Sequence, residues 1–288
     1  MELRIDRVTK QYGKKIAVER LSVTLHSGVY GLLGANGAGK TTLMRMLADL
    51  LQPTAGDITL DGVSIYELGE EYRDLLGYLP QNFGFYPDFT AQDFMHYLAA
   101  VKGIEKRAAK EKTKELLRLV GLGEYARQKV KTFSGGMVRR LGIAQALLND
   151  PVILILDEPT AGLDPKERIR FRNLISEISA ERIVILSTHI VSDVESIANE
   201  ILLMKDGQLI KRGRTSEIAA VAAGKVWNAC VPQGSVSQLQ KHGIIANIKL
   251  NGEKAEIRMI AEVCPIDGAI EVPPTLEDAY LYYFGEEA

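Results

Sequence analysis

A glycine-rich stretch at residues 34–42 has the residue types and spacing needed to hold phosphate groups. It reads Gly34-Ala-Asn36-Gly37-Ala-Gly39-Lys40-Thr41-Thr42. Glycine has no Cβ, so the backbone can wrap closely around phosphates with its N–H groups pointing inward. This order matches the P-loop pattern, in which Lys40 would reach the β- and γ-phosphates and the Thr41 hydroxyl would ligate Mg²⁺. The alternative is a glycine-rich strand-to-helix turn that binds no ligand.

Two acidic residues further along the chain have the chemistry to hold that metal and to activate water. Asp157 and Glu158 directly follow Val152–Leu156, an apolar run that predicts a buried parallel strand. Such a strand delivers its last residues to the carboxyl edge of a sheet, where open α/β sheets bind ligands. Asp157 would hold Mg²⁺ directly or through water, and Glu158 would act as the general base. Alone, the pair would as readily be two solvated acids; the P-loop upstream favours the functional interpretation.

Further motifs stand in a fixed order around these two. Phe133-Ser134-Gly135-Gly136-Met137 precedes a helical pattern and resembles the signature motif of the ATP-binding-cassette (ABC) family. The resemblance covers residues 2–215 and includes Tyr12 as the adenine-stacking aromatic, Gln81 as the Q-loop glutamine, Ala161–Asp164 as the D-loop and His189 as the switch histidine. A GTPase is disfavoured, because no guanine-reading Asn-Lys-x-Asp run occurs.

The resemblance implies an ATP hydrolase that uses ATP and Mg²⁺. Glu158, His189 and Gln81 would be catalytic, and Gln81 would share the metal with Thr41 and Asp157. In this family two cassettes pair head-to-tail, so Ser134, Gly135, Gly136 and Asp164 of one chain would contact the ATP bound by the other. A symmetric pair of this kind has an isologous interface. The chain's complete motif set permits a homodimer, and a heterodimer stays open.

Several of these residues also have ordinary structural interpretations. Tyr12 could be a packing aromatic, and Gln81 and His189 could be solvated loop residues. Asp164 is expected to cap a helix that begins at Pro165, with Glu167 closing a capping box. Met137 stands where the family has glutamine, and a thioether donates no hydrogen bond. We nevertheless expect activity, because Ser134 and the glycines carry the phosphate contact.

Two local stretches resemble a bacterial exporter subgroup that includes bacitracin-type antibiotic exporters. They are Phe85–Thr90 and Pro274–Tyr280. That subgroup pairs a separate ATPase chain with separate transmembrane permease subunits. The resemblance therefore implies a cytoplasmic chain, held on the cytoplasmic face of the membrane through a permease. The transported substrate would be recognised by the permease.

The surrounding pattern predicts an α/β fold with a mixed sheet core, an inserted helical lobe at about 85–150 and a small α+β appendage. The cassette is expected to span 1–215 and the accessory domain 216–288. Leu43, Met46, Leu47, Leu50 and Leu51 have the spacing of one buried helix face. In the appendage, Asn251-Gly252 predicts a hairpin turn, and Thr275 with Asp278 predicts a capping box. The appendage either has a regulatory or binding role or stabilises the sheet.

Composition excludes several other classes of protein. The 288 residues carry a formal net charge of −2, so no basic excess exists to bind nucleic acid. Cys230 and Cys264 lack paired spacing, which fits a reducing compartment. No apolar run approaches the roughly 20 residues that span a bilayer. The alternative function is an ABC ATPase acting on DNA or ribosomes, which the acidity and the single cassette disfavour.

Overall fold

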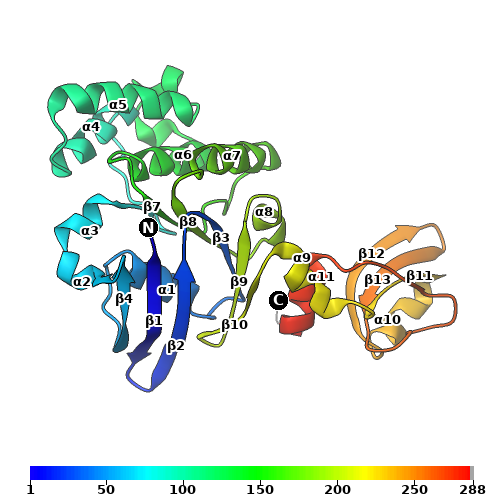
Figure 1. Ribbon diagram of the computed structural model, residues 1–288. Helices are drawn as coiled ribbons and strands as arrows, with labels where there is room; N and C mark the ends of the chain where they lie inside the picture. The colour runs from blue at the N-terminus through cyan, green and yellow to red at the C-terminus, as the bar shows by residue number, and fades with distance from the viewer. Residues whose placement is uncertain (286–288) are drawn as a thin grey trace. The chain divides into compact units, whose positions relative to one another are not determined.

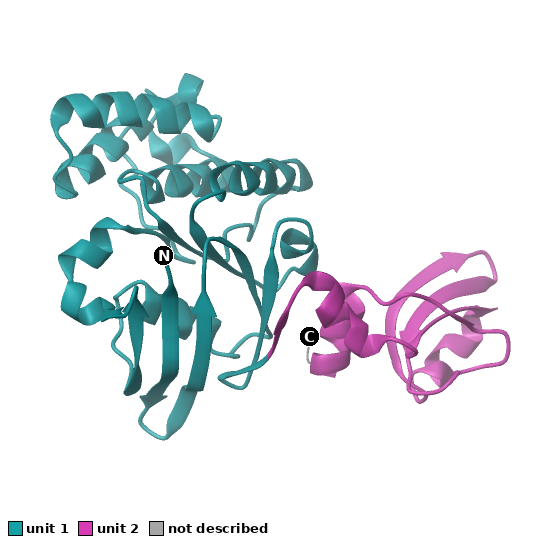
Figure 2. Cartoon of the chain, viewed as in Figure 1, with its two compact units in different colours: residues 1–210 teal, residues 211–288 magenta. Residues whose placement is uncertain are grey.

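The computed structural model describes residues 1–285, and the chain divides into two compact units, 1–210 and 211–288 (Figure 2). The first unit contains the glycine-rich loop and both acidic residues. The division falls a few residues before the expected boundary at 215/216, within a strand that runs from Gln208 to Gly213.

The central sheet of unit 1 has six strands in the order β10-β9-β3-β8-β7-β6. Their bounds are β3 Gly28–Leu33, β6 Leu76–Leu79, β7 Ile153–Asp157, β8 Ile183–Thr188, β9 Glu200–Lys205 and β10 Gln208–Gly213. The pairs β9-β3, β3-β8, β8-β7 and β7-β6 are parallel. Every residue of β7 and β8 is buried, which is why these strands appear as uninterrupted apolar runs in the sequence. The expected α/β fold is confirmed.

A second, antiparallel sheet has the order β2-β1-β4-β5. Its strands are β1 Leu3–Tyr12, β2 Lys15–Leu25, β4 Ala55–Leu60 and β5 Val63–Ser64. One core cluster combines side chains of this sheet, of helix α1 (Lys40–Leu47) and of the central sheet. The predicted helical stripe through Leu50 and Leu51 is wrong at its end, because α1 stops at Leu47 and Leu50 is 58% exposed.

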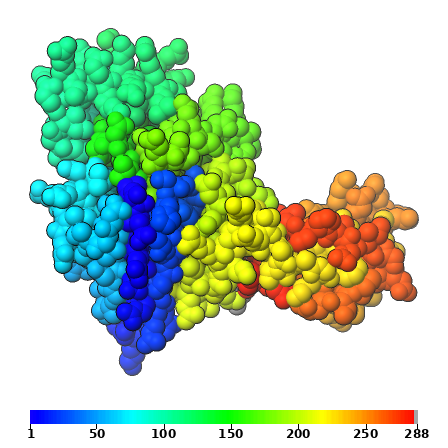
Figure 3. All heavy atoms as spheres, in the orientation of Figure 1, coloured from blue at the N-terminus to red at the C-terminus, as the bar shows by residue number. Residues whose placement is uncertain are grey.

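Part of the helical structure of unit 1 forms a lobe at one end of the unit (Figure 1). The lobe comprises α4 Ala91–Val101, α5 Lys106–Leu119 and α6 Gly135–Ala146. Thr90 caps α4 by accepting a hydrogen bond from Asp93 N at 3.1 Å, and Glu105 caps α5. Figure 3 shows that residues 91–132 gather at this end and do not spread over the unit. The remaining helices are α2 Ile65–Leu68, α3 Glu70–Asp74, α7 Pro165–Ile178 and α8 Val191–Glu195.

Unit 2 has a four-stranded antiparallel sheet, ordered β12-β13-β11-β14, with its own apolar core. Its elements are α9 Thr215–Ala219, β11 Val226–Pro232, α10 Val236–Leu239, β12 Ile244–Asn251, β13 Lys254–Ile260, β14 Ile270–Glu271 and α11 Leu276–Phe284. The predicted hairpin is present, but Asn251 pairs with Lys254, so the two-residue loop is Gly252-Glu253 and not Asn251-Gly252. Gly252 takes the left-handed conformation there, with φ +62°.

A buried ion pair ties the last helix of unit 2 to its sheet. Asp278 accepts hydrogen bonds from Arg258 Nε at 2.9 Å and Nη2 at 2.6 Å, and it closes the predicted capping box with Thr275. Burial alone would raise the pKa of Asp278, but the hydrogen bonds from Arg258 and Thr275 outweigh burial and lower that pKa. The carboxylate is 1% exposed, so removing its charge leaves Arg258 without compensation.

We predict that Asp278→Asn lowers the free energy of unfolding of unit 2 by about 3 kcal/mol at pH 7, because it breaks a buried ion pair. Trp227 is the only tryptophan and lies in β11, so its fluorescence reports this unit during urea unfolding of the full chain. Since the folded pKa of Asp278 is depressed below 3.8, its stabilising contribution is present above that pH and is lost as pH falls through the folded pKa. Glu277→Gln, at the exposed neighbour, is the control; equal effects of both variants would contradict the prediction.

Candidate active site

The glycine-rich loop connects the end of β3 to the start of α1. Gly39 is the N-cap of α1, and its φ of +99° disfavours any residue with a side chain. A Cβ on Gly39 would lie 2.2 Å from Ala17 O, and one on Gly34 would lie 2.3 Å from Met204 O. The loop is therefore packed tightly against neighbouring backbone, and its free N–H groups lie at a helix N-terminus, where anions bind.

Lys40 is buried at the base of this loop. Its Nζ donates hydrogen bonds to Gly34 O at 2.6 Å and Ala35 O at 3.0 Å, and the residue is only 7% exposed. Burial lowers the pKa of Lys40, while the nearby carboxylates of Glu158 and Asp157 oppose that shift. A cation held by two neutral carbonyl groups is placed to exchange them for phosphate oxygens.

The loop lines a pocket of about 340 Å³. It is lined by Tyr12, Lys15, Ala17, Asn36, Gly37, Gly39, Lys40, Thr41, Thr42, Gln81 and Glu158. The structure thus brings Tyr12 and Gln81 to the phosphate loop from other parts of the chain. Lys15 and Ala17 are lining residues that the sequence did not single out. Tyr12 is 46% exposed, so its ring is available to stack on a base.

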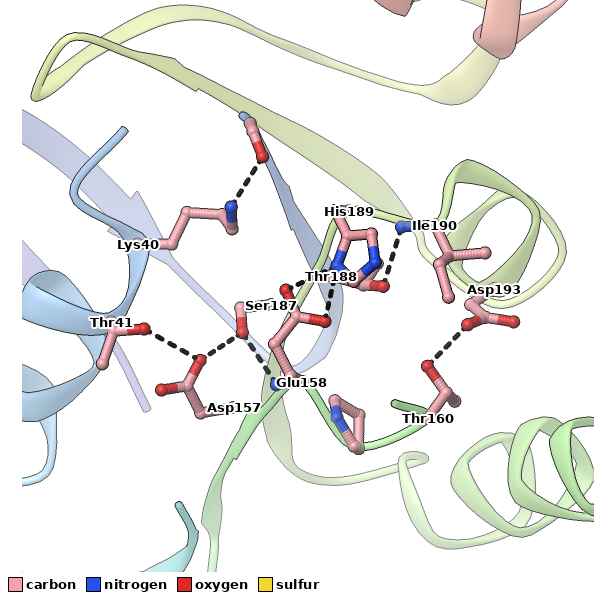
Figure 4. A network of polar contacts seen from close by, with 12 residues as sticks. Lys40, Thr41, Asp157, Glu158, Thr160, Ser187, Thr188, His189, Ile190 and Asp193 are labelled. Atoms are coloured by element: carbon pink, nitrogen blue, oxygen red, sulfur yellow. Dashed lines mark hydrogen bonds and ion pairs between the residues drawn. The ribbon is translucent and has the colours of Figure 1, made fainter. Parts of the chain in front are cut away.

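A row of polar contacts links the two acidic residues to β8 (Figure 4). Ser187 Oγ donates to Asp157 Oδ1 at 2.5 Å and accepts from Glu158 N at 3.0 Å. Thr41 Oγ1 lies 3.5 Å from the same Asp157 oxygen. Asp157 Oδ2 is buried and has no hydrogen-bond partner. A hydroxyl beside an unsatisfied carboxylate oxygen fits the oxygen-only ligand preference of Mg²⁺.

Glu158 stands at the turn that follows β7. It has a φ of +50°, a left-handed conformation that is strained for a residue with a side chain. The residue is 6% exposed, and its two carboxylate oxygens lie 3.0 and 3.1 Å from His189 Nδ1. His189 is half exposed and can donate to this carboxylate from Nδ1 while its other ring nitrogen faces away.

The signature and D-loop residues form a separate cluster that does not line this pocket. Ser134 caps α6 by accepting from Met137 N at 3.2 Å, and Asp164 caps α7 by accepting from Glu167 N at 2.8 Å. A Cβ on Gly136 would lie 3.4 Å from Leu163 in the D-loop. The expected capping box at α7 does not form, because the Glu167 carboxylate pairs with Arg140 and Arg170.

Two further buried contacts surround the site and were not anticipated. Thr160, directly before the D-loop, donates to Asp193 of α8 at 2.5 Å, which connects the start of that loop with the segment after His189. Arg139 of α6 donates to the backbone around Gln81 and Glu158. Charged residues in a helical pattern are usually solvated, so no sequence signal distinguished Asp193 or Arg139 as buried residues.

The fold and the site together define a P-loop nucleoside triphosphate hydrolase. The ABC transporter family model matches residues 18–161. The bacitracin transport ATP-binding protein BcrA of Bacillus licheniformis is 39% identical over 71% of this chain and 67% of its own length. The Nod factor export ATP-binding protein I of Burkholderia lata is 38% identical over 72% of this chain and 68% of its own. The dimeric bacterial ABC transporter cassette MJ0796 superposes with a TM-score of 0.67 at 25% identity, over 74% of this chain and 98% of its own.

The chain belongs to the ABC transporter family and is an ATP-binding, ATP-hydrolysing subunit of the antibiotic-exporter type. The family resemblance inferred from the sequence is confirmed. Within residues 1–285, no helix is both long and apolar enough to span a bilayer.

We predict that Lys40→Ala weakens ATP binding by about 10- to 100-fold, because charge-assisted hydrogen bonds contribute about 1.5–3 kcal/mol each. Equilibrium titration with a fluorescent ATP analogue measures the loss. Lys14→Ala is the control, since Lys14 is exposed and does not line the pocket. Unchanged affinity in the Lys40 variant would show that the phosphates bind elsewhere.

Proposed function

We propose that this chain powers an exporter by closing on a second ATPase chain around two Mg-ATP molecules. The observation that supports the proposal most directly is the separation of the motifs into two clusters. The pocket holds Lys40, Gln81 and Glu158, whereas Ser134–Gly136 and Asp164 lie outside it. The N-terminus of α6, with the capping hydroxyl of Ser134, offers N–H groups that could bind the phosphates of a nucleotide held by another chain. In a head-to-tail pair each signature would meet the partner's ATP.

In the hydrolysis step, Lys40 and the loop N–H groups would hold the phosphates. Thr41, Asp157 and Gln81 would hold Mg²⁺, which supplies neutralisation of the developing negative charge. No three His, Cys, Asp or Glu side chains cluster in residues 1–285 to bind a metal alone, and Mg²⁺ commonly takes one or two carboxylates plus substrate phosphates. Glu158 would accept the proton of the attacking water, and His189 would orient Glu158 and the γ-phosphate.

A groove of about 600 Å³ beside Gln81 is the proposed contact with a separate permease. It is lined by Tyr78, Pro80, Phe83, Gly84, Phe85, Tyr86, Phe94, Tyr97, Leu98, Val101 and Gln145. Tyr86, Tyr97 and Val101 are 47%, 42% and 67% exposed, which leaves an apolar patch of the kind that marks interaction sites. A permease segment seated here would touch the loop that carries Gln81, and nucleotide state would be coupled to the membrane subunit.

The name of one relative supports export as the direction of transport. One relative is named for Nod factor export and the other for bacitracin transport. By analogy, this chain would act at the cytoplasmic face of the membrane through its permease, as part of a homodimer or a heterodimer. The net charge of −2 offers no support for a nucleic-acid partner.

We predict that Glu158→Gln retains ATP binding, reduces hydrolysis at least about a hundredfold and traps an ATP-bound dimer, because it removes the base but keeps the side-chain shape. Size exclusion with light scattering, with and without Mg-ATP, measures the oligomeric state. Adding Lys40→Ala to this variant should abolish the dimer. A variant that hydrolyses ATP at the normal rate would refute the assignment of Glu158.

We predict that Val101→Glu releases the chain from the membranes of cells that contain its permease, because a charge in an apolar contact is costly to desolvate. The fraction of tagged chain that sediments with membranes is the measurement. Val263→Glu is the matched control, since Val263 is 74% exposed and lies in unit 2. Equal membrane fractions for the two variants would exclude the groove as the contact, provided that both bind ATP normally.

A further inference from the structure

Arg139 uses every hydrogen-bond donor that it has on backbone carbonyl groups. Its Nε donates to Pro159 O at 3.1 Å, and its Nη1 donates to Pro80 O at 3.2 Å and Gln81 O at 2.8 Å. Its Nη2 donates to Asp157 O at 2.6 Å and also to Glu158 O. A guanidinium group has five N–H donors, so its capacity is filled by two chain segments.

Three of these acceptors belong to consecutive residues, and the middle one is Glu158, the proposed general base. They are the carbonyl groups of Asp157, Glu158 and Pro159. Glu158 has the strained φ of +50°, and such a conformation persists only where surrounding contacts over-determine it. The planar guanidinium holds the carbonyl groups before, at and after the strained residue in one fixed arrangement.

The other two acceptors belong to the segment around Gln81. One side chain therefore joins the backbone of the Q-loop to the backbone of Glu158. Arg139 itself lies in the second turn of α6, whose N-cap is Ser134 of the signature motif. The signature helix, the Q-loop and the turn at Glu158 therefore meet at Arg139, which does not itself line the pocket.

The burial of Arg139 argues against an incidental role. The residue is 7% exposed, and burying a charge is costly unless its donors are satisfied. Burial lowers the pKa of Arg139, and the carboxylates of Asp157 and Glu158 oppose that shift. A lysine ammonium group has only three donors, in a tetrahedral arrangement. It could not bond the five carbonyl groups that surround the planar guanidinium group.

We propose that Arg139 is a positioning residue for ATP hydrolysis, which holds Glu158 in its strained conformation and links that conformation to the Q-loop. Its removal would let the turn relax and displace the carboxylate from the attacking water. The chemical step would slow while the phosphate loop, which Arg139 does not contact, would bind ATP as before.

The test compares Arg139→Lys and Arg139→Gln with Arg182→Lys in the full chain. Arg182 is a matched control, because it also donates to backbone carbonyl groups, those of Pro151 and Ile178. These carbonyl groups lie before the start of β7 and at the end of α7, not around Glu158. Steady-state hydrolysis gives kcat and KM, and equilibrium titration gives ATP affinity. We expect a kcat about thirtyfold lower for Arg139→Lys, which corresponds to about 2 kcal/mol of lost transition-state stabilisation, and a still lower kcat for Arg139→Gln. ATP affinity should stay within about threefold, and Arg182→Lys should keep kcat within about threefold.

A second readout separates positioning from general stability. Hydrogen exchange at the backbone amides of Asp157, Glu158 and Thr160 should be faster in Arg139→Lys than in the wild type or in Arg182→Lys, with similar Tm values for both variants. A kcat for Arg139→Lys equal to that of Arg182→Lys would overturn the proposal. A parallel loss of kcat, ATP affinity and Tm would also overturn it, because that pattern describes a structural arginine only.

Discussion

The parallel pairing of β3, β7 and β8 is the constraint on which the whole site depends. In this register Leu33 stands beside Thr188 and Asp157 stands beside Ser187, so the phosphate loop, the two acidic residues and His189 all begin at one edge of the sheet. Both faces of β7 and β8 are buried, and a slip by one residue would disrupt the packing on both faces. Core packing thus sets the positions of groups that are distant in sequence.

The polar groups at this edge are arranged around unmet hydrogen-bonding capacity. Lys40 donates only to neutral carbonyl groups of its own loop, and Asp157 Oδ2 is buried without a partner. Ser187 joins the other Asp157 oxygen to Glu158 N, so the two acids are held in a fixed relation. A bound nucleotide with its cation would satisfy both Lys40 and Asp157, and the low local dielectric would strengthen each contact. Unmet capacity of this kind would be used on binding a nucleotide and its cation.

The motifs divide between a pocket that a single chain can build and a cluster that faces elsewhere. α6 contributes to both, since Ser134 caps its first turn while Arg139, one turn later, reaches the backbone of Glu158 and Gln81. Because α6 is a helix, it would connect Ser134 rigidly to Arg139. Closure of a partner chain on the signature motif would then also align the carboxylate of Glu158. Unit 2 has its own apolar core and its own ion pair between Arg258 and the buried Asp278.

Local signals in the sequence determined the α/β class, the glycine-rich loop, the buried strand before the acidic pair, and the caps at Asp164 and Thr275. Each depends on residue types within a few positions, because backbone conformation and first-turn hydrogen bonds are local. Apolar periodicity misplaced the end of α1, since Leu50 continues the stripe without being buried. Tertiary structure alone decided the meeting of Lys15, Gln81 and Glu158 in one pocket, the partners of Glu167, and the left-handed turn at Glu158. It also decided the role of Arg139, because a basic residue in a helix looks solvated until the fold brings five carbonyl groups to it from two distant segments.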